Sequence, residues 1–303
     1  MIIAVTSKSF SRNQKLIAEL KKQFPEAELR LQLKPIGLSR EETIEFLSGC
    51  EKAIIALEEI NDEVLSQLPL LKQISKFGVG LNNIDLSACE KHQVKVGWTG
   101  GVNKISVAEM TLGFMLGLSR NLFLSAFHLN EGNWKKDGGF QLSGKTIGII
   151  GIGHIGKEVI RLLNPFNCKI LANDILDQTD YYQSVGATKA SKEEIYAQSD
   201  IITIHTPLNE STKELLCLET FRKFRKKPYI INTARGGIIK EADLKPALEQ
   251  ELISGAAIDA FISEPLDIEE IYSHKRIICT PHIGGNAKEA VQAMGLSAIE
   301  NLK

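Results

Sequence analysis

The chain has 303 residues, 43% hydrophobic and 24% charged, a globular composition that excludes disordered, collagen-like and low-complexity proteins. Its 36 Lys and Arg residues almost balance 37 Asp and Glu residues, whereas a protein that neutralises many nucleic-acid phosphates is normally basic. At about 100–200 residues per domain, the length predicts two domains, whose partners we expect to be small molecules rather than nucleic acid.

The first hundred residues alternate short apolar runs with longer amphipathic stretches. Helices are predicted over Ser11–Lys22 and Glu41–Ser48. Strands are predicted over Ile2–Val5, Glu28–Leu33, Ala53–Leu57, Gln73–Phe77 and Val94–Trp98. Apolar strands separated by helices indicate a parallel sheet that is covered on both faces, with right-handed crossovers. We therefore expect one doubly wound α/β unit here.

A predicted helix over Ser106–Leu118 and a looser segment over Asn121–Phe140 lead into a second α/β series. Its helix after the first strand covers Ile155–Leu163. Its strands are predicted over Lys145–Ile150, Lys169–Asn173, Ile201–His205, Tyr229–Asn232, Gly255–Ile258 and Arg276–Cys279. The fold class is therefore α/β, with two doubly wound parallel-sheet domains.

The last predicted helix, over Ala287–Leu302, comes after the second sheet is complete. We expect it to pack back on the first unit, and we expect no regulatory domain after it. The first domain is then discontinuous and comprises residues 1–101 plus 287–303, and the second domain comprises residues 102–286.

The five cysteines are scattered, odd in number and without a CxxC pair, which argues against a disulfide framework or a structural zinc site. The N-terminus lacks the basic region and the long apolar run of a signal peptide. No stretch approaches the roughly 18 apolar residues of a membrane span. We therefore expect a cytoplasmic protein that binds no metal and no membrane.

The strongest local motif is GIGHIG over residues 151–156, which matches GxGxxG and lies between a predicted strand and a predicted helix. The first glycine allows a tight turn, the second lets the backbone approach a pyrophosphate, and the third lets the helix pack closely. The helix start then offers N–H groups to phosphate. The alternative is a glycine-rich turn without a ligand. The motif contributes Gly151, Gly153, His154, Ile155 and Gly156 as candidate cofactor residues.

Asp174 ends the next predicted strand, 18 residues after Gly156. An acidic side chain at this place accepts hydrogen bonds from the ribose hydroxyls and would repel a 2′-phosphate. The sequence therefore predicts NAD rather than NADP as the cofactor.

Beyond this motif, the chain resembles the D-isomer-specific 2-hydroxyacid dehydrogenases over essentially its whole length. Seven motifs occur in the same order: residues 78–85, Asn103 with residues 106–109, the dinucleotide loop, residues 205–208, residues 232–237, residues 259–261 with Glu264 and Pro265, and residues 280–285. The resemblance implies a flavodoxin-like substrate domain, an NAD-binding Rossmann domain and a homodimer, with the Asn121–Gly139 segment near the partner subunit.

The resemblance also implies three catalytic residues, Arg235, Glu264 and His282. Oxidation of a 2-hydroxy acid removes a hydride, which NAD takes, and a proton, which needs a base that titrates near neutral pH. A histidine suits that role, and a carboxylate beside it fixes the imidazole tautomer and favours the protonated form. An arginine offers a planar fork for the substrate carboxylate.

Further contacts follow from the resemblance. Asp259 would accept from the nicotinamide amide. The other implied cofactor residues are Thr206, Pro207, Thr233, Ala234, Gly284 and Gly285. Backbone N–H groups of the first domain would hold the substrate carboxylate, since glycines let a ligand approach the chain closely. The candidate substrate residues are Lys76, Gly78, Val79 and Gly80.

Within the family, the chain most resembles the short D-3-phosphoglycerate dehydrogenases, and this resemblance implies 3-phosphoglycerate or phosphohydroxypyruvate as substrate. A phosphorylated substrate needs cations in the first domain, yet residues 56–59 read ALEE, and Lys76 is the one basic residue close to the glycine motif. A hydroxypyruvate or glyoxylate reductase is the alternative within the family. A non-enzymatic NAD(H)-sensing interaction protein is the alternative from another class.

Overall fold

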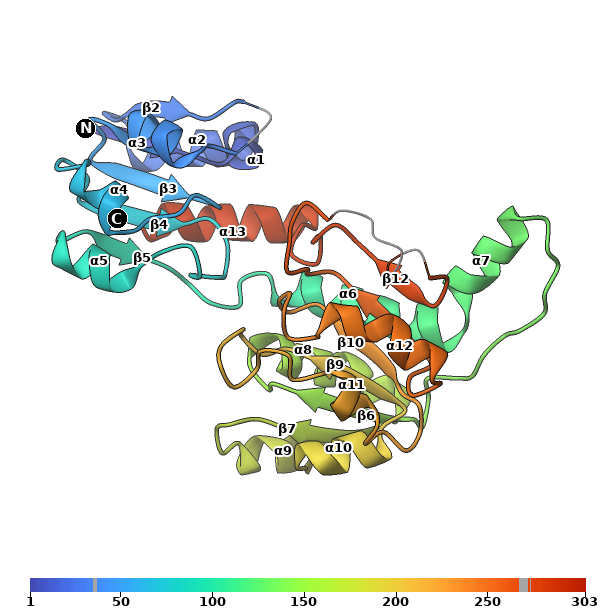
Figure 1. The fold of residues 1–303 in the computed structure, drawn as a ribbon. Helices are drawn as coiled ribbons and strands as arrows, with labels where there is room; N and C mark the ends of the chain where they lie inside the picture. Colours follow the sequence, from blue (N-terminus) through green and yellow to red (C-terminus); the bar gives the residue numbers. More distant parts are fainter. Residues whose placement is uncertain (35–36, 267–271, 273) are drawn as a thin grey trace. The chain divides into compact units, whose positions relative to one another are not determined.

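The computed structural model describes residues 1–34, 37–266, 272 and 274–303, and it divides into two compact units. Unit 1 comprises Met1–Asn103 and Asn286–Lys303, and unit 2 comprises Lys104–Gly285. Figure 1 shows the two units with their helices and strands. Each unit is built around one sheet, and the two are described in turn.

Unit 1 holds a five-stranded sheet in the order β2-β1-β3-β4-β5, in which every pair is parallel. The strands are β1 (Ile2–Val5), β2 (Glu28–Leu31), β3 (Lys52–Ile55), β4 (Gln73–Lys76) and β5 (Lys95–Gly97). This is the order of flavodoxin-like sheets. The predicted flavodoxin-like fold of this part of the chain is confirmed.

Helices cover both faces of this sheet, because successive strand side chains point to opposite sides. The helices are α1 (Lys8–Ser11), α2 (Gln14–Gln23), α3 (Arg40–Leu47), α4 (Asp62–Ser66), α5 (Leu86–Lys91) and α13 (Lys288–Glu300). Ile3 and Ile54 pack in a cluster with α2 and α13, whereas Ala4 and Ile55 pack in a cluster with α3, α4 and α5. Because alternate strand residues point to opposite faces, unit 1 has one apolar cluster on each face of its sheet.

One predicted helix of unit 1 is interrupted. The sequence predicts a single helix over Ser11–Lys22, but the structure has α1 ending at Ser11 and α2 beginning at Gln14. The Asn13 side chain accepts from the backbone N–H groups of Lys15 and Leu16 at 3.1 and 3.3 Å. Asn13 therefore caps a new helix, as asparagine commonly does, and the earlier helix stops before it.

Unit 2 holds a seven-stranded sheet in the order β12-β11-β10-β9-β6-β7-β8, again parallel throughout. The strands are β6 (Thr146–Ile150), β7 (Lys169–Asn173), β8 (Thr188–Lys189), β9 (Ile201–Ile204), β10 (Tyr229–Asn232), β11 (Gly255–Ile258) and β12 (Ile277–Cys279). The order reverses next to β6, which is the topological switch point of a Rossmann fold. The predicted Rossmann fold is confirmed.

Two groups of helices enclose this sheet. The helices are α6 (Lys104–Ser119), α7 (Leu122–Asn130), α8 (His154–Leu163), α9 (Thr179–Val185), α10 (Lys192–Gln198), α11 (Leu218–Phe221) and α12 (Leu244–Glu249), with 3-10 turns at Asn164–Phe166 and Glu241–Asp243. Ile231 and Ala257 are buried with α6 and α8, while Ile230 and Ala256 are buried with α10, α11 and α12.

The segment over Asn121–Phe140, expected to be loose, contains the helix α7. Figure 1 shows α7 in green, followed by a long loop that returns to unit 2. Over the residues that the structure describes, no single helix is long and apolar enough to span a membrane. Only α6 and α7 taken together meet those criteria, and that pair is bent by 61°.

The packing of α13 on α2 generates a stability prediction. Gly295 lies so close to the fully buried Leu16 that a β-carbon at this position would overlap the Leu16 side chain. We expect Gly295→Val to lower the free energy of unfolding of unit 1 by about 1–3 kcal/mol, the usual cost of overpacking a core. Thermal unfolding measures it. Leu296→Ala, at a neighbouring exposed position, is the control, and equal stability of the two variants would contradict the packing.

Candidate active site

Three side chains predicted from the sequence come together in unit 2, where β10, β11 and β12 end. The Nδ1 atom of His282 lies 2.7 and 3.0 Å from the two carboxylate oxygens of Glu264. Burial lowers the pKa of the Arg235 guanidinium below its ordinary value, and the charge of Glu264 acts in the opposite direction. The Glu264 carboxylate thus contacts the imidazole directly and acts on the guanidinium through its charge.

The loop that carries Arg235 is fixed by the last residue of β10. The buried Asn232 side chain accepts from the Ala234 backbone N–H at 3.0 Å and donates to the Arg235 carbonyl at 2.8 Å. The guanidinium itself donates to the Ala234 carbonyl at 2.7 Å. Asn232 lies inside one of the family motifs of the sequence, and only the structure shows that its side chain holds this loop.

Asp259 holds the loop of His282 from both sides. Its carboxylate is 1% exposed and accepts from the Thr280 hydroxyl at 2.6 Å, from Ile283 N–H at 2.9 Å and from Gly284 N–H at 2.7 Å. His282 lies between these anchors with a φ of 51°, a left-handed conformation that is uncommon for a residue other than glycine. Three charge-assisted hydrogen bonds therefore stabilise the strained turn that presents the imidazole.

The loop that carries Glu264 is anchored in a similar way. Phe261 N–H donates to Glu264 Oε1 at 2.9 Å, and Ile262 N–H donates to Glu241 Oε1 at 2.9 Å. Gly236 packs directly on the Phe261 backbone, where a β-carbon would overlap the carbonyl group. The loops of Arg235 and Glu264 are thus packed together, and Glu241 is a contributor that no motif had indicated.

The three glycines of the dinucleotide loop lie in different surroundings, so each position favours glycine for a different reason. Gly151 has a φ of 95°, and a β-carbon there would lie 2.6 Å from the His205 carbonyl oxygen. At Gly156 a β-carbon would overlap the Gly151 carbonyl. A β-carbon added at Gly153, at the start of α8, would meet no atom within 4 Å. Packing within the chain therefore does not require a glycine there. This open space beside the helix N-terminus fits a pyrophosphate.

Two further features of this edge fit a dinucleotide. Asp174 follows β7 and accepts from Ile152 N–H at 2.6 Å and Leu176 N–H at 2.9 Å, which turns its carboxylate toward the glycine loop. The Thr206 hydroxyl is buried, and no hydrogen-bond partner is found for it among the described residues. An unsatisfied buried hydroxyl is costly unless a ligand supplies the partner.

The other predicted cofactor residues lie on the same edge of the unit 2 sheet. His154 and Ile155 begin α8, and Pro207 follows β9. Thr233 and Ala234 follow β10 and are buried, and the Thr233 hydroxyl lies 3.0 Å from that of Thr111 on α6. Gly284 is held by Asp259 and by the Ser106 hydroxyl, which donates to its carbonyl at 2.5 Å, and Gly285 follows it.

His205, adjacent to Thr206, is not a candidate acid or base. Its burial lowers the pKa of the imidazole to about 3, so the ring stays neutral at physiological pH. Its Nε2 atom lies 3.0 Å from the Thr203 hydroxyl. These contacts support a structural role for His205.

The predicted substrate residues of unit 1 follow β4. Gly78 has a φ of 140°, and the Val79 carbonyl accepts from the Trp98 indole N–H at 3.0 Å. Lys76, at the end of β4, is 7% exposed, and its ammonium group donates to the Ala56 carbonyl and to Asn83 Oδ1. The glycine turn is partly exposed, whereas the Lys76 side chain is directed into its own unit.

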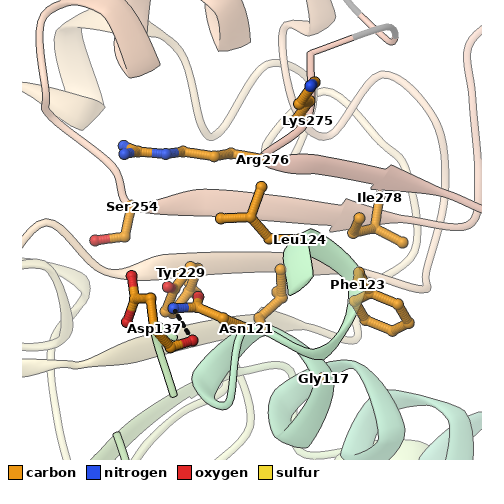
Figure 2. A pocket seen from close by; sticks show the side chains of 11 residues that line it. Gly117, Asn121, Phe123, Leu124, Asp137, Tyr229, Ser254, Lys275, Arg276 and Ile278 are labelled. Carbon is orange, nitrogen blue, oxygen red and sulfur yellow. Dashed lines mark hydrogen bonds between the residues drawn. The ribbon is translucent and has the colours of Figure 1, made fainter. Parts of the chain in front are cut away.

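A cavity of about 190 Å³ lies elsewhere in unit 2, next to the first residues of β10, β11 and β12. Figure 2 shows Tyr229, Ser254 and Arg276 around it, together with Asn121 at the start of α7 and Asp137 in the loop that follows α7. Since the strands are parallel, this edge is opposite the predicted site. Among the described residues, no group of three or more His, Cys, Asp or Glu side chains could hold a metal ion.

The fold and site define a Rossmann-type nucleotide-binding unit in one chain with a flavodoxin-like unit. Residues 112–284 match the family described as D-isomer specific 2-hydroxyacid dehydrogenase, NAD binding domain. The chain belongs to this family.

Named relatives support the assignment. The chain is 36% identical to D-3-phosphoglycerate dehydrogenase of Rattus norvegicus over 86% of this chain and 49% of that protein. It is 32% identical to hydroxypyruvate reductase of Thermotoga maritima over 88% of each. A crystal structure of a Thermus thermophilus protein superposes with a TM-score of 0.90 at 27% identity, over 100% of this chain and 96% of that one. The chain spans about half the length of the D-3-phosphoglycerate dehydrogenases.

The open space at Gly153 generates a binding prediction. We expect Gly153→Val to weaken NADH binding at least about tenfold, or about 1.4 kcal/mol, because the added side chain fills the space for the pyrophosphate. NADH fluorescence titration measures it, and the loss of stability should be limited to the small cost of a poorer helix N-cap. Gly156→Val, in contrast, should lower stability because its side chain overlaps the Gly151 carbonyl. Normal NADH affinity of Gly153→Val would place the pyrophosphate elsewhere.

Proposed function

We propose that the protein is an NAD-dependent oxidoreductase that interconverts a D-2-hydroxy acid and the corresponding 2-keto acid. The observation that carries this proposal is the close arrangement of Arg235, Glu264 and His282 on the edge of the sheet that also bears the dinucleotide loop. Membership of the family supports it.

His282 is the proposed proton carrier. With Glu264 accepting a hydrogen bond from Nδ1, the neutral tautomer carries its lone pair on Nε2, and 46% of the side chain is exposed. In oxidation Nε2 takes the proton of the substrate hydroxyl, and in reduction it returns a proton to the carbonyl oxygen. Glu264 stabilises the imidazolium that forms in between.

Arg235 is the proposed ligand of the substrate carboxylate. Its side chain is partly buried and remains cationic, since a guanidinium does not lose its proton in proteins. The planar group can bind a carboxylate through two hydrogen bonds and polarise the adjacent carbonyl. The hydrogen bonds of Asn232 keep its backbone in place for this contact.

NAD would supply the hydride acceptor and, when reduced, the hydride donor. Gly151–Gly156 and the first turn of α8 would hold its pyrophosphate, and Asp174 its ribose. The Asp259 carboxylate offers about four acceptor positions, of which three are used by the His282 loop, so one remains for the nicotinamide amide. The remaining proposed contacts are Thr206, Pro207, Thr233, Ala234, Gly284 and Gly285.

The test of this function is the loss of turnover on removal of the imidazole. We expect His282→Ala to lower kcat by about 10²–10⁴-fold, the range of general acid–base catalysis, while NADH still binds. Loss of NADH absorbance with a panel of 2-keto acids measures turnover. His92→Gln, at a histidine in unit 1 paired with Asp62, is the control. Full activity of His282→Ala would remove this residue from the mechanism.

We also propose that the chain forms a homodimer through α7 and the loop that follows it. No residue of α7 is buried, and Leu122, Phe127, Leu129 and Trp134 are 50–78% exposed. The loop is nevertheless held at its ends, because Phe140 N–H donates to the Ser119 carbonyl at 2.7 Å and Glu131 pairs with Lys275 at 2.6 Å. A fixed, exposed apolar surface of this kind is typical of a protein contact, here with a second copy.

The dimer can be tested by molar mass. We expect the wild-type protein to have the mass of two chains in light scattering, and Phe127→Glu or Trp134→Glu to shift it toward one chain, because a charge would be buried in the contact. Leu70→Glu replaces an exposed leucine of unit 1 and should leave the mass unchanged. A single-chain mass for the wild-type protein would overturn the proposal.

A further inference from the structure

We infer that the substrate is an unphosphorylated 2-keto or 2-hydroxy acid whose side chain is uncharged and at least partly apolar. This inference rests on the proposed function and adds the chemistry of the part of the substrate next to its carboxylate. It comes from unit 1, where the backbone N–H groups of the glycine turn after β4 are predicted from the family resemblance to help hold that carboxylate. The neighbours of β4 in the sheet are β3 and β5.

The loops that follow these three strands carry no cation. Residues 56–61, 77–85 and 98–103 contain neither Lys nor Arg, and they include Glu58, Glu59 and Asp85. The nearby Arg40 side chain is paired with Glu63 at 2.7 Å and with Glu59 at 3.7 Å. A phosphate dianion is normally bound by charge-assisted donors, and beside two glutamates it would be repelled.

Lys76 is not directed toward a ligand of this edge. Its ammonium group is buried and donates to Asn83 Oδ1 at 2.6 Å and to the Ala56 carbonyl. The Asn83 amide donates in turn to the carbonyls of Glu58 at 2.6 Å and Ala56 at 3.2 Å. Lys76 and Asn83 thus hold the loop after β3 in one conformation. We therefore assign Lys76 to positioning that loop, in place of the predicted substrate contact.

The conformation of this loop decides which side chain is presented. Glu58 turns inward, is 6% exposed, and accepts from Ala56 N–H at 3.1 Å and from the Thr6 hydroxyl. Leu57 in consequence points outward and is 87% exposed. Leu57, rather than a charged side chain, is therefore what the loop after β3 presents to a ligand.

A second apolar side chain flanks the glycine turn from β5. Trp98 is 43% exposed, and its indole N–H donates to the Val79 carbonyl within the turn. The loop after β3 thus contributes an exposed Leu57, and the residue after β5 contributes Trp98, on the two sides of the β4 glycine turn. Pyruvate, 2-oxobutanoate and 4-methyl-2-oxopentanoate have side chains of this chemistry.

The wild-type protein is tested with NADH and five acids: these three, hydroxypyruvate and phosphohydroxypyruvate. We expect kcat/KM for the preferred uncharged acid to exceed that for phosphohydroxypyruvate at least about tenfold. A preference for phosphohydroxypyruvate would overturn the inference and leave the proposed function intact. No turnover with any acid, with NADH binding intact, would overturn both.

A charge substitution tests the role of Leu57 itself. We expect Leu57→Arg to raise the ratio of kcat/KM for phosphohydroxypyruvate over hydroxypyruvate at least about tenfold, because it adds the missing cation. Leu70→Arg places the same charge at another exposed leucine of unit 1 and should leave the ratio unchanged. An unchanged ratio for Leu57→Arg, in a protein whose stability matches the wild type, would overturn the assignment of Leu57 as the specificity residue.

Discussion

In both sheets every strand is paired in parallel with its neighbours, so the carboxyl ends of the strands lie along one edge of each sheet. The loops after β6, β7, β9, β10, β11 and β12 therefore meet at one edge of unit 2. Those loops contain the glycine motif, Asp174 and the three proposed catalytic residues. Ligands of open α/β sheets bind at this edge for the same reason. The cavity in Figure 2 lies at the other edge, which separates it from the proposed chemistry.

A buried carboxylate organises the proposed proton carrier. Asp259 is almost fully shielded from water, and a charge in that position is costly unless hydrogen bonds compensate it. The compensation comes from Thr280, Ile283 and Gly284, which surround His282 in the sequence. Burial of one charge thus fixes the direction of an imidazole that is itself half exposed. The same principle operates in unit 1, where buried Lys76 fixes the loop of Leu57.

The relatives of the chain are named as enzymes of different substrates, among them D-3-phosphoglycerate dehydrogenase and hydroxypyruvate reductase. Family membership therefore does not select a substrate. We propose that side chains near the glycine turn make this selection. In this chain they are Leu57, Trp98 and inward-turned polar groups, whose charge and exposure favour an unphosphorylated acid.

The sequence by itself determined the two parallel sheets, because continuous apolar runs separated by amphipathic helices have few other ways to be buried. It also determined the dinucleotide loop and the order of Arg235, Glu264 and His282, since both depend on local motifs. It did not determine the break at Asn13, the helix α7 or the anchoring of His282 by Asp259. Nor did it determine that Lys76 turns inward while Leu57 turns out. The anchoring of His282 and the inward turn of Lys76 arise from hydrogen bonds between residues distant in the chain, which only the tertiary structure brings together. The break at Asn13 comes from a local helix cap that the apolar pattern does not reveal.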